Sequence, residues 1–519
     1  MKRTIAGLSA LMLVLTLAQP VQAQDAFNPE LIQVPQTSAT FVIGETGVAL
    51  NSSSLGATSR NQQEQWTCDG PLDPECADSK VSWVRGTGIV PVCESESDAN
   101  CVVSLEITNS EGVFEPAAFV RYAVGAEFAA NSRVDFFKQG TPSLWDAPHA
   151  PSASGLTKYA VIVGVTQYKE PGQARFQTEN FIASVFPYRE QTGNYEAPYQ
   201  FTLVGKNPVT GREGRSMAGG GGGYDCGWVE AGTCGVVQDF ADGTKVKLTI
   251  RISKTVGGWF QGRIKNPQIS VTDFSRTHNE ISVEAEPAIV QRMHHVIEDA
   301  KKLTSKEKSL VRGFAGSWDG FITWASSSDW TGFEFVDYFR TKTKDTAAGQ
   351  NSFWNFSSTQ NPGQGSRCLA DKSKVLGIVT TNAMVYDGGV PKFTRGFLNY
   401  KVAGLHFEAD GTTEVLGSYD LVMRSDVARC LYGFSSAPVS ATITIAGEGD
   451  RTIATTIVSE KNGWLKLAAY GFTFSEKTIR VRITQPKRTT ITCVTTSKPV
   501  KTQRVSGINP TCPTGFKKR

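Results

Sequence analysis

The chain has 519 residues, a formal net charge of +4 and an apolar content typical of globular proteins. This length suffices for about three domains of ordinary size, each able to bury a core. Because 53 basic residues nearly balance 49 acidic ones, the composition does not favour wholesale nucleic-acid binding.

Residues 1–23 have the three parts of an export signal. Lys2 and Arg3 form the positive region, residues 5–18 are apolar, and small residues precede a predicted cleavage between Ala23 and Gln24. Gln24 stands where a lipoprotein would carry cysteine. No later stretch approaches eighteen consecutive apolar residues, so we expect no transmembrane span in the mature protein.

The ten cysteines fit an oxidising destination, such as the outside of the cell. Three pairs share the same C-x7-C spacing around polar or glycine-bearing loops, as expected for turns joining two strands. Other connectivities stay open, because spacing alone does not fix pairing. The favoured pairs are Cys68–Cys76, Cys93–Cys101, Cys226–Cys234, Cys368–Cys430 and Cys493–Cys512. There is no CxxC motif, so disulfides are preferred to a metal site, and no cofactor is expected.

Residues 24–155 form the first predicted β domain, with strands over 81–85, 101–107 and 116–124. Residues 141–155 are rich in proline, serine and glycine and are typical of a linker or domain edge.

The second predicted β domain covers residues 156–286 and includes a continuous apolar run over 159–165, typical of a buried strand. Further strands are predicted over 181–186 and 199–204. Five consecutive glycines at 219–223 lack the Gly-Lys-Ser/Thr of a phosphate loop, so a flexible loop anchored by Cys226 is the preferred interpretation.

The clearest pattern in this domain is the alternation over residues 245–252. Val246, Leu248, Ile250 and Ile252 alternate with polar and charged residues, which predicts a half-buried antiparallel strand. Glycines 257 and 258 can reverse the chain, so we expect residues 259–264 to return alongside this strand.

Residues 287–312 are predicted to form a helical connector, because apolar residues recur there at three- and four-residue steps. Thr304 with Glu307 could cap a second short helix. On a helix, His294 and His295 would each face an acidic residue four positions on. Adjacent helical side chains point about 100° apart, so a solvated helix face is preferred to a metal site.

Residues 313–486 form the third predicted β domain. Asp-Gly turn signals occur at 387–389 and 410–411, and strands alternate over 439–445 and 478–483.

The best ligand-site candidate lies within residues 317–339, where aromatic residues concentrate beside acidic ones. Aromatic faces stack on sugars and carboxylates accept their hydroxyls, although an aromatic core is the preferred interpretation of most of this stretch. Phe333, Phe335 and Phe339 are expected to face the core. The candidate binding residues are Trp318, Trp324, Asp329, Trp330 and Asp337. Asp319, Asp329, Glu334 and Asp337 are the candidate carboxylates for glycoside hydrolysis, but no GxSxG or HExxH motif accompanies them.

Residues 487–519 form a basic tail that contains no acidic residue and is predicted to be closed by its two cysteines. The tail either aids solubility or attaches the protein to an anionic cell envelope. The cations proposed for attachment are Lys498, Lys501, Arg504, Lys517, Lys518 and Arg519.

The tail, TITCVTTSKPVKTQRVSGINPTCPTGFKKR, resembles the terminal segment of uncharacterised secreted actinobacterial proteins that carry a TCV…NPxCPxGYKKK pattern. Phe516 replaces the usual tyrosine. The segments GGWFQGRIKNPQISVT and DVARCLYGFSSAPVSATITI are similar to parts of the same proteins. The resemblance implies no activity, so no catalytic residue is transferred from it.

Together these patterns predict a mainly β protein of two or three antiparallel sandwich- or jelly-roll-like domains, with one helical connector and local disulfides. The favoured function is that of an exported, non-catalytic cell-surface or extracellular protein that binds glycans or envelope polyanions and not nucleic acid. The alternative is an extracellular carbohydrate-active enzyme using carboxylates within residues 319–337.

Overall fold

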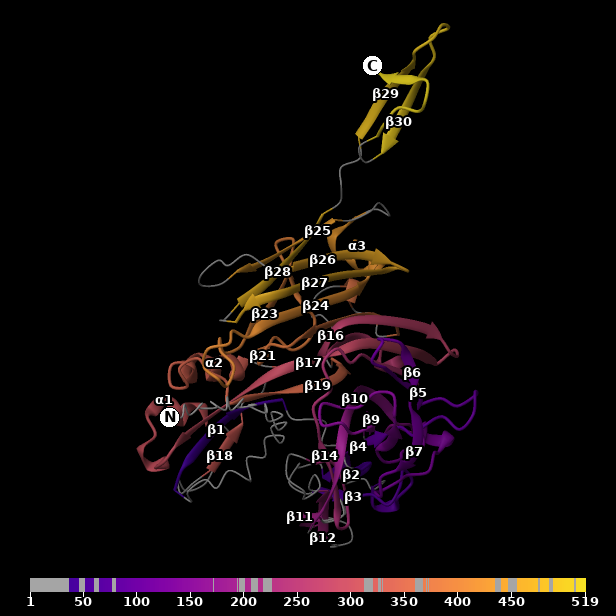
Figure 1. The fold of residues 1–519 in the computed structure, drawn as a ribbon. Coiled ribbons are helices and arrows are strands. Elements are labelled where there is room, and N and C mark those ends of the chain that lie inside the picture. The colour runs from indigo at the N-terminus through magenta and orange to yellow at the C-terminus, as the bar shows by residue number, and fades with distance from the viewer. Residues whose placement is uncertain are drawn as a thin grey trace, which may run out of the picture.

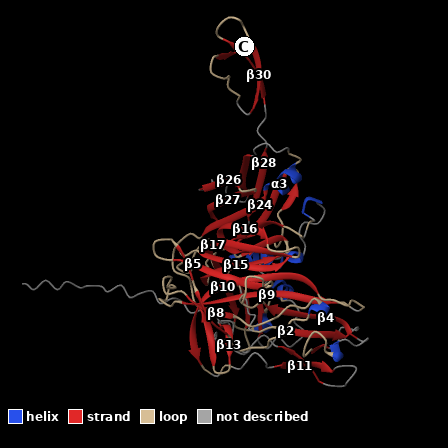
Figure 2. Ribbon diagram, turned by 90° about the vertical axis from the view of Figure 1, so that its right-hand side faces the viewer, coloured by secondary structure: helices blue, strands red, loops and turns tan. Residues whose placement is uncertain are grey.

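The computed structural model describes the greater part of the chain after residue 36, and the fold is mainly β, as predicted (Figures 1 and 2). The described residues are 37–45, 52–59, 65–76, 81–170, 172–193, 195, 201–206, 213–217, 226–311, 321–324, 328, 330–359, 367–369, 371, 373–434, 440–446, 455–474, 477–484, 489–507 and 510–519. The predicted signal peptide and its Ala23–Gln24 cleavage site, and the glycine run at 219–223, lie outside them.

A long central sheet runs through the molecule. Neighbouring strands are antiparallel, except that β16 and β20 are parallel. Its strands, in spatial order, are β2 (Ser54–Ser59), β4 (Val81–Ile89), β9 (Lys158–Lys169), β10 (Gln177–Thr192), β19 (Gly349–Ser358), β16 (Gly258–Asp273), β20 (Val375–Thr381), β24 (Leu416–Arg424), β27 (Trp464–Thr473) and β26 (Thr455–Lys461).

A second sheet packs on one face of the central sheet. It consists of β5 (Cys101–Thr108), β15 (Val246–Ser253), β17 (His278–Ile297) and the second half of β16. Val163 and Phe181 of the central sheet share a buried core with Leu248 and Ile281 of the second sheet. Burying each such side chain contributes about 1.5–3 kcal/mol, so this core is the main source of stability in the region.

The alternation over residues 245–252 is confirmed, since Val246, Leu248, Ile250 and Ile252 are all buried. The predicted return of residues 259–264 beside this strand is wrong. β17 pairs with β15 on one side and with β16 on the other, so it lies between them. The turn at Gly257 therefore sends the first half of β16 into the central sheet, where it pairs with β19 and β20.

The predicted boundary between residues 24–155 and 156–286 does not separate two domains. β4 pairs with β9, and β5 pairs with β15, so strands from both segments share the same sheets. β19, from the predicted third domain, pairs with β10 and β16. Long-range pairing of this kind overrides the local composition shift at residues 141–155.

The predicted helical connector over residues 287–312 is wrong for its first half. Residues up to Ile297 belong to β17, where Ala288 to Arg292 pair with β19 and Met293 to Ile297 pair with β1 (Ala39–Ile43). Ile289 is 47% exposed between buried neighbours, so the three- and four-residue spacing did not define one buried face. The short helix capped by Thr304 is confirmed as α1 (Ser305–Leu310), with Glu307 completing the capping box.

β1 also pairs in parallel with β18 (Phe321–Trp324), beside a helix that the sequence analysis did not predict, α2 (Trp330–Arg340). At the other end of the central sheet from β2, the strands β20, β24 and β27 pack on a smaller sheet. That sheet is made of β21 (Val385–Tyr386), β23 (Phe397–Ala403), β28 (Lys477–Thr484) and β25 (Ser440–Ala446). β22 (Lys392–Thr394) pairs with β23, and α3 (Ser425–Tyr432) lies near β24 and β27.

All five predicted disulfides are confirmed: Cys68–Cys76, Cys93–Cys101, Cys226–Cys234, Cys368–Cys430 and Cys493–Cys512. The remaining strands are β3 (Gln65–Thr67), β6 (Phe114–Pro116), β7 (Ala118–Tyr122), β8 (Ser143–Asp146), β11 (Phe201–Lys206), β12 (Glu213–Met217), β13 (Cys226–Glu230) and β14 (Thr233–Val237).

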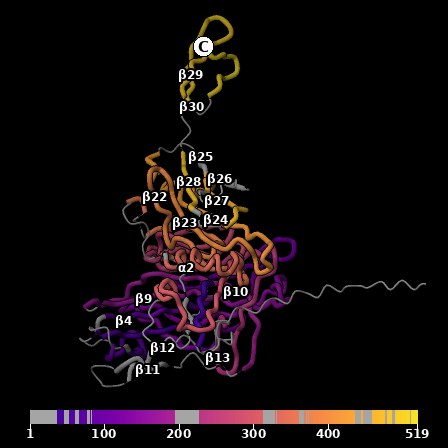
Figure 3. The backbone as a smooth tube through the Cα atoms, turned by 90° about the vertical axis from the view of Figure 1, so that its left-hand side faces the viewer, coloured from indigo at the N-terminus to yellow at the C-terminus, as the bar shows by residue number. Residues whose placement is uncertain are grey.

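The tail forms a three-stranded sheet of its own, made of β29 (Thr489–Thr495), β30 (Thr502–Gly507) and β31 (Phe516–Lys518). Figures 1 and 3 show it apart from the larger body of strands. No helix among the described residues has the length and apolar character needed to cross a membrane.

Candidate functional site

The aromatic stretch singled out in the sequence is largely a core element. α2 places Phe333, Phe335 and Phe339 in a buried cluster, and the Phe41 ring lies 4.7 Å from the Phe339 ring. The expectation that these three phenylalanines face the core is confirmed.

The proposed binding and catalytic residues of this stretch belong to α2, to β18 and to segments outside the described residues. Trp318, Asp319 and Asp329 lie outside the described residues, and for Trp324 and Trp330 only the backbone placement, on β18 and α2, is described. The two described acids, Glu334 and Asp337, are both exposed on α2.

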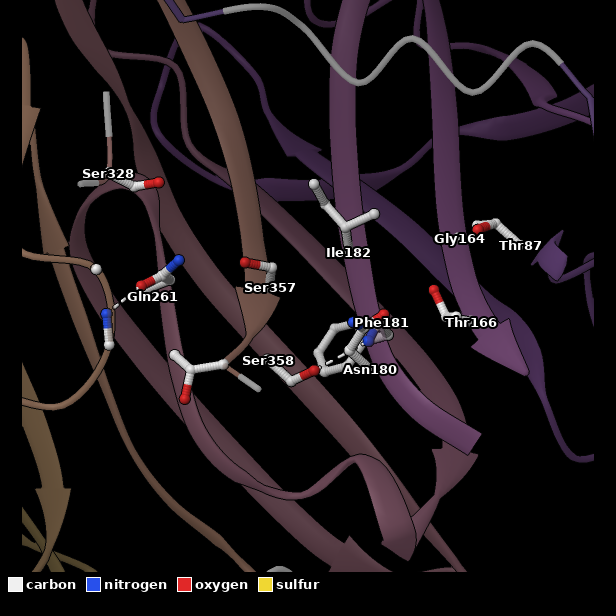
Figure 4. A pocket seen from close by; sticks show the side chains of 13 residues that line it. Thr87, Gly164, Thr166, Asn180, Phe181, Ile182, Gln261, Ser328, Ser357 and Ser358 are labelled. Atoms are coloured by element: carbon white, nitrogen blue, oxygen red, sulfur yellow. Dashed lines mark hydrogen bonds between the residues drawn. The ribbon is translucent and has the colours of Figure 1, made fainter. Parts of the chain in front are cut away.

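A polar groove of about 470 Å³ lies on the face of the central sheet opposite the main core (Figure 4). Five strands contribute to it: β4, β9, β10, β19 and β16. Ser328, from the aromatic stretch, and glycines 388 and 389, from the predicted turn after β21, form its other wall. Its lining residues are Thr87, Gly164, Thr166, Asn180, Phe181, Ile182, Gln261, Ser328, Ser357, Ser358, Thr359, Gly388 and Gly389.

Strand register explains why these side chains meet. Gly164 is opposite Ile182, Ile182 is opposite Ser357, and Ser357 is opposite Gln261. Directly opposite residues in paired strands share a face, so these positions form one row across four strands. A parallel row joins Thr87 to Thr166 and Thr166 to Asn180.

The alternate positions of the same strands point into the main core. Val163, Val165, Phe181 and Phe356 are all buried there. Because successive side chains in a strand point to opposite faces, the polar residues between them face the groove. The same alternation thus builds both the core and the groove.

Two backbone contacts fix the far wall of the groove. The Gly389 N–H donates to Gln261 Oε1 at 2.6 Å, and the Gly388 N–H donates to the Ser328 carbonyl at 3.1 Å. A Cβ added at Gly388 would lie 2.6 Å from the Ser328 carbonyl oxygen, so only glycine permits this approach. The Gln261 Oε1 acceptor is thus occupied, whereas its Nε2 donor makes no hydrogen bond to a described residue and can donate to a ligand.

Several polar groups of the groove make no hydrogen bond to any residue that the structure describes. Within the described residues, the side chains of Thr87, Thr166, Asn180 and Ser357 have no such partner. Thr166 is only 6% exposed. A hydroxyl held at such a depth loses much of its hydration, and a ligand that supplies a hydrogen bond there recovers the lost free energy.

The groove is also electrically neutral. Its described lining contains hydroxyl, amide and apolar side chains and glycines, and no carboxylate, ammonium, guanidinium or imidazole group. Sequence analysis missed this site because its residues are ordinary strand positions. The signal was present in short runs such as Val165-Thr166 and Phe356-Ser357, but recognising it requires the strand register.

Buried charged groups elsewhere are satisfied by the protein itself. Arg263, on β16, is completely buried, and its Nε donates to Glu45 at 2.7 Å. Its Nη atoms donate to the backbone carbonyls of Thr381, Ala383 and Met384. Arg263 therefore connects Glu45, which follows β1, to the chain segment that runs from the end of β20 to β21.

A second buried group, Asp420 on β24, joins β24 to β27 and β16. Tyr470 donates its hydroxyl to Asp420 at 2.5 Å, and the Asn266 N–H donates at 3.0 Å. The Lys466 ammonium lies 4.0 Å away and also donates to the Asn266 side chain. Burial raises the pKa of Asp420 to about 6, although these hydrogen bonds and Lys466 oppose the shift.

The histidine pair does not form the predicted helix face. His294 and His295 lie on β17, opposite Val42 and Phe41 of β1. Burial lowers the pKa of both imidazoles. Within the described residues, no three His, Cys, Asp or Glu side chains gather as a possible metal site.

The six cations proposed for envelope attachment all lie in the tail sheet or its connecting segments, and all are exposed. They are Lys498, Lys501, Arg504, Lys517, Lys518 and Arg519.

Comparison with known proteins adds no relative: neither a family model nor a curated protein matches this chain.

Proposed function

We propose that the protein is an exported, non-catalytic extracellular or cell-surface protein whose groove binds a neutral saccharide. The observation that supports this proposal is the combination of neutral lining and unpartnered hydroxyl and amide groups in the groove. Sugar hydroxyls both donate and accept hydrogen bonds, as do Thr166, Asn180 and Ser357. A charged ligand would gain no ion pair from the described lining and would lose hydration.

The spacing of the groove supports the same ligand class. Neighbouring strands lie about 4.8 Å apart, so groups in one row repeat across the sheet at roughly the width of a sugar ring. An oligosaccharide lying across the strands would present successive hydroxyls to Thr87, Thr166 and Asn180 in one row, and to Ser357 and Gln261 in the other.

The expected affinity is modest. Four neutral hydrogen bonds at about 1 kcal/mol each amount to roughly 4 kcal/mol, which corresponds to a Kd of about 1 mM for an oligosaccharide that reaches all four groups. Shorter saccharides that reach fewer of these groups should bind more weakly.

Two further parts of the proposal are that the protein is exported and that it is not an enzyme. The signal-like residues 1–23 and the five disulfides suit an oxidising compartment outside the cell. Glycoside hydrolysis requires a pair of carboxylates flanking the bond that breaks, and no described residue lining the groove is acidic.

The proposal is tested by titrating the full mature chain with neutral oligosaccharides and following binding by NMR or calorimetry. We expect Asn180→Ala with Ser357→Ala to weaken binding about 30-fold, as loss of two hydrogen bonds of about 1 kcal/mol each predicts. Ser270→Ala with Thr272→Ala is the matched control, since both residues are exposed on β16 outside the groove lining. Equal weakening by the two pairs, or no binding of any neutral oligosaccharide, would reject the groove as a saccharide site.

The aromatic candidates and the enzymatic alternative are tested with the same ligands. If Trp324 and Trp330 stack on the saccharide beside Ser328, replacing both with alanine should weaken binding, and unchanged binding dismisses them. The carbohydrate-active enzyme stays an alternative prediction, because Asp329 follows groove-lining Ser328 in the sequence. Release of new reducing ends that Asp329→Asn abolishes would favour the enzyme.

A further inference from the structure

The tail sheet has two unlike faces. β29 is its central strand, with β30 on one edge and β31 on the other. Thr492 is opposite Arg504, and Val494 is opposite both Thr502 and Lys517. Since opposite residues share a face, Arg504 and Lys517 lie on the same side of the sheet. Arg519 joins them, because its N–H donates to the Thr492 carbonyl, one residue beyond the Cys493–Lys518 pair.

The other face is covered. Cys493, on the central strand, is fully buried and forms a disulfide with Cys512. Cys512 belongs to the connection from β30 to β31, which must pass over β29 to reach the opposite edge of the sheet. The disulfide therefore holds this connection against the Cys493 face, and we name the opposite side, bearing Arg504, Lys517 and Arg519, the open face.

The open face is both cationic and rich in hydroxyls. Arg504, Lys517 and Arg519 are exposed, and none forms an ion pair with a described residue. Thr492 lies between Arg504 and Arg519, and Thr490 faces Ser506 with their hydroxyl oxygens 2.7 Å apart. Because residues 486–519 contain no acidic residue, no carboxylate side chain in the tail neutralises these cations.

The positions of the cations favour a polymer over a single ion. The backbones of Arg504 and Arg519 lie two strand spacings apart, or about 10 Å. The backbones of Lys517 and Arg519 lie about 7 Å apart along one strand. Anchors at such distances suit a chain of repeating negative charges that extends across the face.

The neighbouring hydroxyls favour phosphate over carboxylate. A guanidinium fork occupies both oxygens of a carboxylate, whereas a phosphate within a linear polymer still has its bridging oxygens, which are weaker acceptors that a threonine hydroxyl beside the arginine can reach. Arg504, Thr492 and Arg519 supply this alternation of guanidinium and hydroxyl in a single row.

We propose that the open face of the tail sheet binds a linear polymer of repeating phosphate groups at the cell surface, and so attaches the protein through a site distinct from the groove. Neutralising about three phosphates predicts that log K falls with log salt with a slope near −2, or about a 20-fold loss of affinity between 50 and 200 mM salt.

The test uses the full mature chain and inorganic polyphosphate of defined length. The open-face variant is Arg504→Gln, Lys517→Gln and Arg519→Gln. The matched control is Lys498→Gln, Lys501→Gln and Lys518→Gln, which removes the same charge from the turn and from the Cys493 face. We expect the open-face variant to lose at least about tenfold in affinity with most of its salt slope, and the control to lose less than about threefold.

Equal losses in the two variants would overturn the proposal, because they would show that total charge alone sets the affinity. Polyglutamate of matched charge binding as tightly as polyphosphate would also overturn it, because it would show that phosphate is not preferred to carboxylate. So would the absence of polyphosphate binding by the unmodified chain. Intact-mass analysis showing all ten cysteines oxidised in both variants confirms that neither result comes from loss of the tail disulfide.

Discussion

The groove and the tail sheet both present polar side chains on one face of a β-sheet, but different forces hold the two sheets in place. The groove lies on strands whose opposite face belongs to a large apolar core. In the tail, Cys493 is the sole fully buried residue among those described from 489 onward. A neutral, shaped site is therefore built here on packing, whereas a cationic surface is built on a small sheet closed by a disulfide.

The largest expected effect on the packed body comes from Arg263. Arg263→Met should lower the free energy of unfolding by about 3–5 kcal/mol, because it removes a fully buried donor from the half-buried Glu45 carboxylate and from buried backbone carbonyls. Denaturant unfolding measures the change. Arg85→Met is the control, since the Arg85–Glu179 pair is partly exposed and should contribute less than about 1 kcal/mol. Similar losses in the two variants would contradict the role assigned to Arg263.

In the tail, the largest loss of stability should come from removing the Cys493–Cys512 disulfide. Replacing Cys493 and Cys512 with serine removes a cross-link that stabilises a loop of this size by about 3 kcal/mol, comparable with all that so small a sheet can supply from packing. Hydrogen exchange should show the amides of residues 489–507 losing protection while those of β9 and β15 keep it. Retained protection in the tail would mean that packing holds it.

Features of the fold also differ in whether they could be predicted from the sequence. The spacing of the cysteines and the alternation of Val246 to Ile252 predicted the disulfides and β15, because both signals act over a few residues. The capping box at Thr304 and Glu307 was equally local. The segment 287–297 was predicted wrongly as helix, because its partners β1 and β19 lie far away in the sequence.

The candidate sites divide in the same way. The cations of the tail could be read directly from the sequence, although their division between two faces needed the register of β29 with β30 and β31. The groove could not be predicted, because Thr166, Asn180 and Ser357 come from separate strands and meet only through pairing. Among the described residues of 317–339, Ser328 alone lines the groove, and it lies close in the sequence to Trp324 and Trp330, which the sequence favoured for ligand binding.

The smallest predicted effect is a pH dependence that belongs to the body alone. Burial raises the pKa of Asp420 to about 6, so the folded state binds a proton more tightly than the unfolded state. The stabilisation is complete below the unfolded pKa near 4 and is lost as the pH rises through about 6. Asp420 should therefore add about 1 kcal/mol to stability between pH 7 and pH 5.

Asp420→Asn should remove this gain, as measured by unfolding at the two pH values. The histidines 278, 294 and 295, whose pKa values are lowered by burial, act in the opposite direction in both proteins and cancel in the difference. If stability changed between pH 7 and pH 5 by the same amount in the wild type and in Asp420→Asn, Asp420 would not have the raised pKa.

We propose two separate binding sites on one chain, a neutral saccharide site in its packed body and a phosphate-polymer site on its tail. The most direct test is to titrate the wild type, the Asn180→Ala, Ser357→Ala variant and the Arg504→Gln, Lys517→Gln, Arg519→Gln variant with a neutral oligosaccharide and with polyphosphate, at 50 and 200 mM salt. We expect each variant to weaken the binding of one ligand alone, and we expect salt to weaken polyphosphate binding about 20-fold while leaving saccharide binding unaffected. Loss of both ligands in either variant, or saccharide binding that falls with salt, would contradict it.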